Sequence, residues 1–178
     1  MCKIRKMLSF LIPVIGLTVM SIILVGCESQ EKEKSENIKT LEEKNKDIVR
    51  ANFEEFFNAH NIAAVEKYNT ADTIIHFSDG DKTLEEDTTQ LQTFYTAFPD
   101  LHLTIDDLIA EGNKVAMVWT INGTHKSEFM GIPATGRRIE LKGMDVYRMA
   151  DGKIAEIWTS AEILGLMQQL GAIPSMNE

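Results

Sequence analysis

Cysteine is almost missing from this chain of 178 residues, which contains only Cys2 and Cys27. Both lie within the first 27 residues, so the rest of the sequence has no thiol for a disulfide, a thiolate nucleophile or a cysteine-ligated metal. This absence excludes a zinc ribbon and cysteine-based catalysis.

Metal and phosphate motifs are missing as well. The four histidines are scattered, and no two have the His-x-x-x-His spacing of a helical zinc site. The segment "GIPATGRR" at 131–138 contains glycines but not in the order of a phosphate-binding loop, so it predicts a rigid turn. We therefore expect neither a metal nor a cofactor.

Basic residues are fewer than acidic ones. The chain has 18 lysines and arginines against 27 aspartates and glutamates, which gives a formal net charge of −9. An acidic protein repels phosphate backbones, so we expect no nucleic-acid partner.

The start of the chain has a different composition. Three basic residues, at 3, 5 and 6, precede an almost wholly apolar stretch that ends in Leu-Val-Gly-Cys at 24–27. This order is typical of an exported signal peptide, and its last four residues resemble the bacterial lipobox. The sequence predicts a lipoprotein signal over 1–27, with a lipid on Cys27 that holds the protein outside the cytoplasm at a bacterial membrane. A membrane-spanning helix is the alternative.

The next segment, "ESQEKEKSEN" at 28–37, has no apolar residue. Such a segment buries too little surface to order itself, which predicts a charged tether over 28–39. The remaining residues, 40–178, are enough for one domain with one core.

The period of the apolar residues changes within this domain. Helical spacing dominates up to Pro99, and capping boxes at Thr40-Leu-Glu-Glu43 and Thr83-Leu-Glu-Glu86 predict two helix starts. After Pro99 the period is two, which predicts four strands near 101–105, 115–121, 139–147 and 153–158, followed by a terminal helix. We therefore predict an α+β fold, with about three N-terminal helices packed on one face of a bent antiparallel sheet.

Two polar residues share the parity of the apolar side chains in the central strands. His125 has the parity of the apolar residues in the strand near 115–121, and Asp145 has that of the apolar residues in the strand near 139–147. The apolar positions are Val115, Met117, Trp119 and Ile121 in the first strand, and Ile139, Leu141 and Tyr147 in the second. An unpaired buried polar group costs about 1–3 kcal/mol. A histidine and an aspartate that face one interior therefore predict a proton-transfer pair.

A structural interpretation of the same two residues stays open. In this alternative, His125 lies in solvent just past the strand end, and Asp145 forms an ion pair with an arginine. The candidate arginines are Arg137, Arg138 and Arg148.

The stretch "EIWTSAEILG" at 156–165 also allows two interpretations. Thr159-Ser-Ala-Glu162 matches a capping box in front of an apolar helical run. Glu162 is therefore predicted to cap the last helix, and a catalytic carboxylate at the mouth of a pocket is the alternative.

Four motifs occur together in a specific order: Phe-Pro-Asp at 98–100, Gly-Thr-His at 123–125, Gly-Ile-Pro-x-Thr-Gly at 131–136 and Gln-Gln-Leu-Gly at 168–171. With them the chain resembles the SnoaL-like polyketide cyclase, or ester cyclase, family over roughly residues 45–171. The resemblance implies the α+β cone of the nuclear-transport-factor-like superfamily, in which a bent antiparallel sheet and three helices enclose a pocket.

The resemblance also implies an activity, the cofactor-free ring closure of polyketide esters by a carboxylate in an apolar pocket. In many relatives an Asp follows the last-strand tryptophan and another comes three residues later, where this chain has Thr159 and Glu162. We expect an apolar small-molecule ligand, with catalysis by Asp145, His125 and Glu162. Trp119, Tyr147 and Trp158 are the expected binding residues. A non-catalytic binding or interaction module at the membrane surface is the alternative, and a homodimer is left open.

Overall fold

The computed structural model describes residues 15–174, with side chains at Gln30 and from Lys32 onward. Residues 1–14 of the predicted signal and the Cys27 side chain lie outside the described part. Among the helices of the described residues, none is both long and apolar enough to cross a membrane. The chain divides after Thr40 into two compact units, which are described separately.

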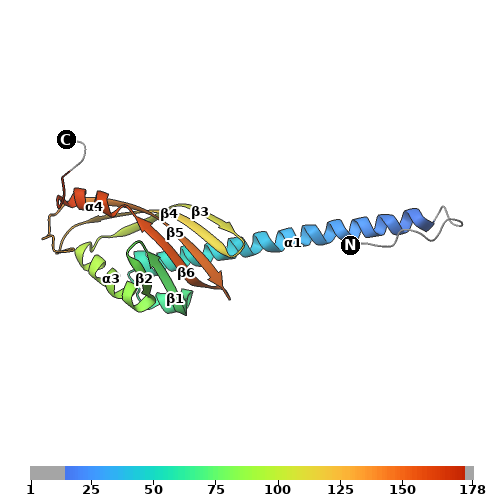
Figure 1. The fold of residues 1–178 in the computed structure, drawn as a ribbon, viewed down its shortest axis with the longest axis horizontal. Helices are drawn as coiled ribbons and strands as arrows, with labels where there is room; N and C mark the ends of the chain where they lie inside the picture. The colour runs from blue at the N-terminus through green and yellow to red at the C-terminus, as the bar shows by residue number, and fades with distance from the viewer. Residues whose placement is uncertain (1–14, 175–178) are drawn as a thin grey trace. The chain divides into compact units, whose positions relative to one another are not determined.

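The first helix, α1, is continuous from Ile15 to Phe53 (Figure 1). The predicted helix start at Thr40 is therefore wrong. The Thr40 hydroxyl donates to the Glu36 carbonyl at 2.9 Å, a bond that threonine makes inside a helix rather than at its start. Residues 28–39, predicted as a tether, are helical here, and the domain boundaries stay predictions.

The second unit, Leu41–Glu178, combines helices with one sheet. After α1 the elements are η1 (Glu54–Asn58, a π-helical turn), α2 (Ala64–Tyr68), β1 (Asn69–Phe77), β2 (Gly80–Thr83), α3 (Leu84–Ala97), β3 (His102–Glu111), β4 (Lys114–Thr124), β5 (Arg138–Ala150), β6 (Lys153–Ala161) and α4 (Ile163–Leu170). The α+β prediction is confirmed. The helix count is confirmed only in part, because the described residues form four α-helices.

All six strands form one sheet in the order β2-β1-β6-β5-β4-β3 (Figure 1). Neighbours are antiparallel except β1 and β6, which run parallel. The sequence analysis did not predict β2 or the parallel pair, because β2 consists of the polar residues "GDKT" and parallel pairing joins distant segments. The second capping box is confirmed, since Thr83 and Glu86 exchange both bonds at the start of α3.

The core lies on the concave face of the sheet, as the strand parity predicts. The apolar side chains of β4 and β5 are buried there against α1, α3 and α4. The helices contribute Val49, Phe53, Leu166 and Leu170, and Phe98, directly after α3, is buried with them. Full burial of a side chain of this size contributes about 1.5–3 kcal/mol, so this face holds the fold together.

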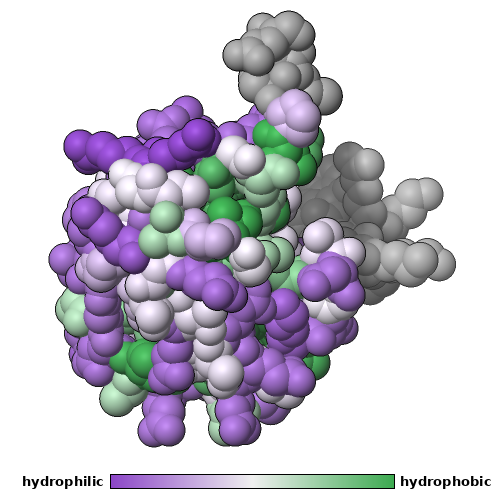
Figure 2. All heavy atoms as spheres, turned by 90° about the vertical axis from the view of Figure 1, so that its left-hand side faces the viewer, coloured by the Kyte–Doolittle hydropathy of each residue, from purple (hydrophilic) through white to green (hydrophobic). Residues whose placement is uncertain are grey.

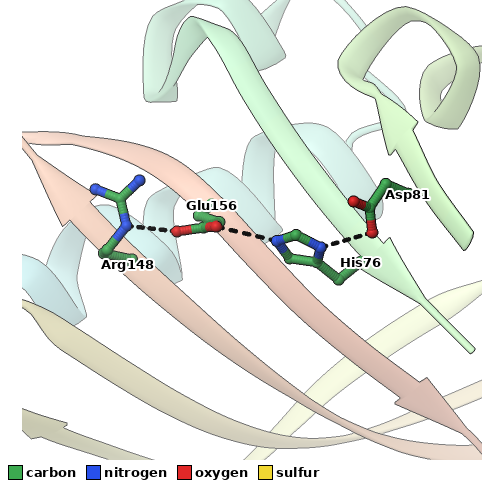
Figure 3. Close-up of polar contacts among 4 residues, drawn as sticks. All are labelled: His76, Asp81, Arg148 and Glu156. Atoms are coloured by element: carbon green, nitrogen blue, oxygen red, sulfur yellow. Dashed lines mark hydrogen bonds and ion pairs between the residues drawn. The ribbon is translucent and has the colours of Figure 1, made fainter.

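A charged network crosses the opposite face of the sheet (Figure 3). The His76 ring on β1 lies between two carboxylates, with Nδ1 2.7 Å from Asp81 and Nε2 3.0 Å from Glu156. Arg148 Nε donates to the other Glu156 oxygen at 2.6 Å. The network joins β2, β1, β6 and β5, and the two carboxylates, Asp81 first, raise the pKa of His76.

We expect His76 to stabilise the protein in a pH-dependent way. Because its folded pKa is raised, its contribution is complete below the unfolded pKa of about 6.5 and is lost as pH rises through the folded value. Urea unfolding of His76→Gln should therefore show a larger deficit at about pH 6 than at about pH 9. An equal loss of stability at both pH values would mean that the charge of His76 contributes nothing and that only its neutral ring stabilises the protein. His102→Gln, at an exposed histidine, is the control.

Candidate functional site

Asp145 lies in the middle of the concave face. Its residue is 7 % exposed, and its Oδ2 accepts a hydrogen bond of 2.5 Å from the Tyr147 hydroxyl. Its Oδ1 is buried without a hydrogen-bond partner in the described residues. The expected parity is confirmed, and the ion-pair alternative is wrong, because Arg148 pairs with Glu156 and Arg137 donates to the Gln169 carbonyl.

Burial raises the pKa of Asp145, which the Tyr147 bond partly opposes. Thr159 and Trp119 also favour the ionised carboxylate, although neither meets hydrogen-bond geometry with it. One carboxylate oxygen therefore has no hydrogen-bond partner in the described residues. A desolvated carboxylate that keeps an unpaired oxygen is typical of functional sites.

The strand register determines the neighbours of Asp145. Directly opposite are Met117 on β4 and Thr159 on β6. In the next row on the same face, Gly143 lies between Trp119 and Ala161. Thr159 and Ala161 have short side chains and are only partly buried, so the β6 side of this face stays partly accessible.

A second carboxylate approaches from α3. The pKa of Asp87 is raised to about 6: burial raises it most, the positive charge of Lys82 opposes the rise, and the negative charge of Asp145 adds to it. The sequence analysis missed Asp87, because an acid in the first turn of a helix is expected to balance the helix dipole. Its spacing from Leu84 and Leu91 was the available signal, since it places Asp87 on the apolar stripe of the helix.

His125 is fully buried, so the solvent alternative is wrong. The Thr135 N–H donates to His125 Nδ1 at 3.3 Å, which assigns the proton of the neutral ring to Nε2. That Nε2 is buried without a partner in the described residues, and the ring stacks on Phe98.

His125 does not meet Asp145. Asp145 pairs with Met117, and His125 comes eight residues later, roughly 26 Å along an extended strand. The two residues have no hydrogen-bond partner in common. The expected proton-transfer pair is therefore not formed.

The capping box predicted at 159–162 is also wrong. Thr159 belongs to β6, and Glu162 is the N-cap residue of α4 but makes no capping bond through its side chain. The Glu162 N–H instead donates to the Lys142 carbonyl at 2.9 Å, which extends the pairing with β5. Strand pairing outcompetes the local helix signal here, and it leaves the Glu162 side chain exposed.

The three aromatic residues expected to bind a ligand lie on two different faces of the sheet. Trp119 and Tyr147 are buried beside Asp145. Trp158 is 37 % exposed on the opposite face, where its ring stacks on His76 at 5.0 Å. The structure therefore brings together Asp145, Trp119 and Tyr147, and places His125, Glu162 and Trp158 elsewhere.

The domain has two further surface features. Figure 2 shows that the face at the α4 end is mostly hydrophilic, with a broad apolar area near its top and smaller apolar areas lower down. On α4, Ile163 and Leu164 are exposed, directly after the Ala161 row. A separate hollow of about 510 Å³ lies between α1, η1 and β3, with Phe53 in its wall. No group of three or more candidate metal ligands occurs within residues 15–174.

Comparison with known proteins places this geometry in a family. The profile of a family described as "SnoaL-like polyketide cyclase" matches residues 47–170. No match is found among the curated proteins.

Solved structures of other proteins have a similar fold. AclR from Streptomyces galilaeus is 26% identical over 77% of this chain and 87% of its own, with a TM-score of 0.71. IdmH from Streptomyces antibioticus is 29% identical over 71% and 98%, with a TM-score of 0.64. TsrD from Streptomyces laurentii is 27% identical over 70% and 92%, with a TM-score of 0.63.

Proposed function

Because the chain belongs to the SnoaL-like polyketide cyclase family, we propose that it is a cofactor-free acid–base enzyme for an apolar carbonyl compound. Asp145 removes a proton from the carbon beside the carbonyl and returns it to a second position, as in an isomerase or a ring-closing enzyme. The observation that carries the proposal is the buried Asp145 carboxylate, whose Oδ1 has no partner in the described residues.

The surroundings of Asp145 suit such a role. Tyr147 holds Oδ2, so the free Oδ1 is the atom that accepts the proton. Burial raises the pKa of Asp145, and a carboxylate with a raised pKa is a stronger base once it is ionised. On the β6 side of Asp145, Thr159 and Ala161 have short side chains and are only partly buried, so we place the substrate there.

The position of Thr159 supports the same assignment. The family resemblance implies an aspartate there in many relatives, and Asp145 lies directly across from it on the neighbouring strand. The carboxylate of Asp145 on β5 therefore reaches the same part of the interior as an aspartate at position 159 on β6 would. Asp145 can therefore take the acid–base role that the aspartate at position 159 is implied to have in many relatives.

Proton exchange provides a test that needs no knowledge of the natural substrate. With 2-tetralone, an apolar bicyclic ketone, in D₂O, the protein should accelerate the replacement of hydrogen by deuterium beside the carbonyl, as followed by NMR. No acceleration over buffer with 2-tetralone and a panel of β-keto esters would instead support the non-catalytic binding module.

The ionisation of Asp87 should affect the rate of this proton exchange as the pH changes. Since the pKa of Asp87 is raised to about 6, its ionisation adds a negative charge near Asp145 above that pH. The rate profile should therefore change slope near about pH 6, and Asp87→Asn should remove that change. The exposed Asp72→Asn is the control, and an unchanged profile in Asp87→Asn would contradict the assignment.

We also propose that the protein is anchored by lipid on Cys27 outside the cytoplasm of a bacterium, as the Leu-Val-Gly-Cys order predicts. Cys27→Ser should abolish labelling by a radioactive fatty acid and release the protein from the membrane fraction or leave an uncleaved precursor. Cys2→Ser should keep both the label and the membrane location. Labelling that survives Cys27→Ser would overturn the anchor.

A further inference from the structure

Two buried polar atoms without a hydrogen-bond partner in the described residues belong to neighbouring strands of the concave face. Trp119 Nε1 and Asp145 Oδ1 are both buried without a partner in the described residues. Trp119 is 6 % exposed, and its strand position faces Gly143, two residues before Asp145. One atom is a hydrogen-bond donor and the other an acceptor, on strands that run about 4.8 Å apart.

Gly143 sets the position of the indole. A Cβ at Gly143 would lie 2.1, 2.4 and 2.6 Å from Trp119 Cζ2, Cη2 and Cε2. The ring therefore lies flat against the glycine, and any larger residue would displace it. Because Cε2 is bonded to Nε1, this contact holds the N–H edge of the ring against β5, the strand that carries Asp145.

We propose that Trp119 is a second catalytic residue, whose N–H binds the carbonyl oxygen of the substrate, and that Gly143 is its positioning residue. This inference rests on the proposed function. A carbonyl compound of the class proposed above then offers an acceptor to Trp119 and a C–H proton to Asp145.

The proton and electron changes balance without a cofactor. The C–H proton moves to Asp145 Oδ1, the electron pair of that bond forms the C=C bond of an enolate, and the π pair of the carbonyl moves onto its oxygen, to which the Trp119 N–H donates. Asp145 then gives the proton back to the same carbon or to a second carbon of the enolate, which regenerates the free carboxylate. A fixed donor in a buried site stabilises the developing charge more than the neutral carbonyl, which accelerates the reaction.

The test uses 2-naphthol, which is the aromatic analogue of the 2-tetralone enol, and naphthalene, which lacks the hydroxyl. The parent should bind 2-naphthol more tightly than naphthalene. Trp119→Phe keeps a ring and removes the donor, so the affinity for 2-naphthol should fall about tenfold and that for naphthalene should stay. Exchange into 2-tetralone should fall about 10²-fold in Trp119→Phe and by a similar amount in Gly143→Ala.

A spectroscopic signal decides the matter even if Trp119→Phe folds poorly. The chain has two tryptophans, so Trp158→Phe leaves the Trp119 indole as the only one. Its N–H resonance should move downfield with 2-naphthol and not with naphthalene.

The outcomes separate the two proposals. If Trp119→Phe keeps parental exchange and parental 2-naphthol affinity, or if the indole resonance does not move, the inference is overturned while Asp145 chemistry stands. If the parent does not exchange 2-tetralone, the proposed function fails. The 2-naphthol preference and the indole shift then still decide whether Trp119 binds a ligand oxygen.

Discussion

Replacing Asp145 by asparagine should slow proton exchange into 2-tetralone by about 10²–10⁴-fold, the range that a positioned acid or base contributes. Asparagine keeps the shape of the side chain and cannot accept a proton. The fold should survive, because the Tyr147 hydroxyl can still donate to the amide oxygen. The rates are measured by NMR at equal concentrations of folded protein.

The same variant should be at least as stable as the parent at neutral pH. Because burial raises the folded pKa of Asp145, the parent loses stability as pH rises from the unfolded value towards the folded one. Asparagine avoids this loss, so its advantage in urea unfolding should grow with pH. A variant that loses stability and exchanges protons at the parental rate would make Asp145 a structural residue.

Tyr147→Phe should have the second large effect. The Tyr147 hydroxyl is the only group that meets hydrogen-bond geometry with Asp145 in the described residues. Its removal leaves both carboxylate oxygens unpaired and should cost about 1–3 kcal/mol of stability. The pKa of Asp145 should rise further, so exchange should begin at a higher pH than in the parent.

A double-mutant cycle separates this bond from the rest of the tyrosine. In the Asp145→Asn background, Tyr147→Phe should lose less stability than in the parent, because no charge is then left unpaired. The ring itself stays packed edge-on against Phe53. Tyr95→Phe, which removes a bond to the Phe56 carbonyl, is the matched control. Onset of exchange at an unchanged or lower pH in Tyr147→Phe would contradict the assigned contact.

Alternation along the strands predicted the inward-facing residues well. A strand places every second side chain on one face, so Asp145, Trp119 and Tyr147 could be placed on the concave face from spacing alone. The same parity correctly predicted that His125 is buried, but it does not say how far along the sheet His125 lies from Asp145. That position depends on how β4 and β5 pair, which local sequence does not determine.

The other errors have the same origin. Thr159 and Glu162 match a capping box, yet pairing of Thr159 with Asp145 keeps the segment extended. Thr40 matches another box within a helix that simply continues. Asp87 lies in the polar first turn of α3, and its approach to Asp145 depends on how that helix packs. Each local signal was real, and a long-range contact overrode it.

The most direct test is the pKa of Asp145 itself, measured in the intact protein by carbon NMR with labelled aspartate and assigned by the signal that disappears in Asp145→Asn. We predict that this carboxyl titrates clearly above the ordinary value of 3.8, because it is desolvated and keeps one oxygen unpaired. Titration at or below 3.8 would mean that Asp145 is solvated or paired with a cation, and would contradict a buried acid–base site.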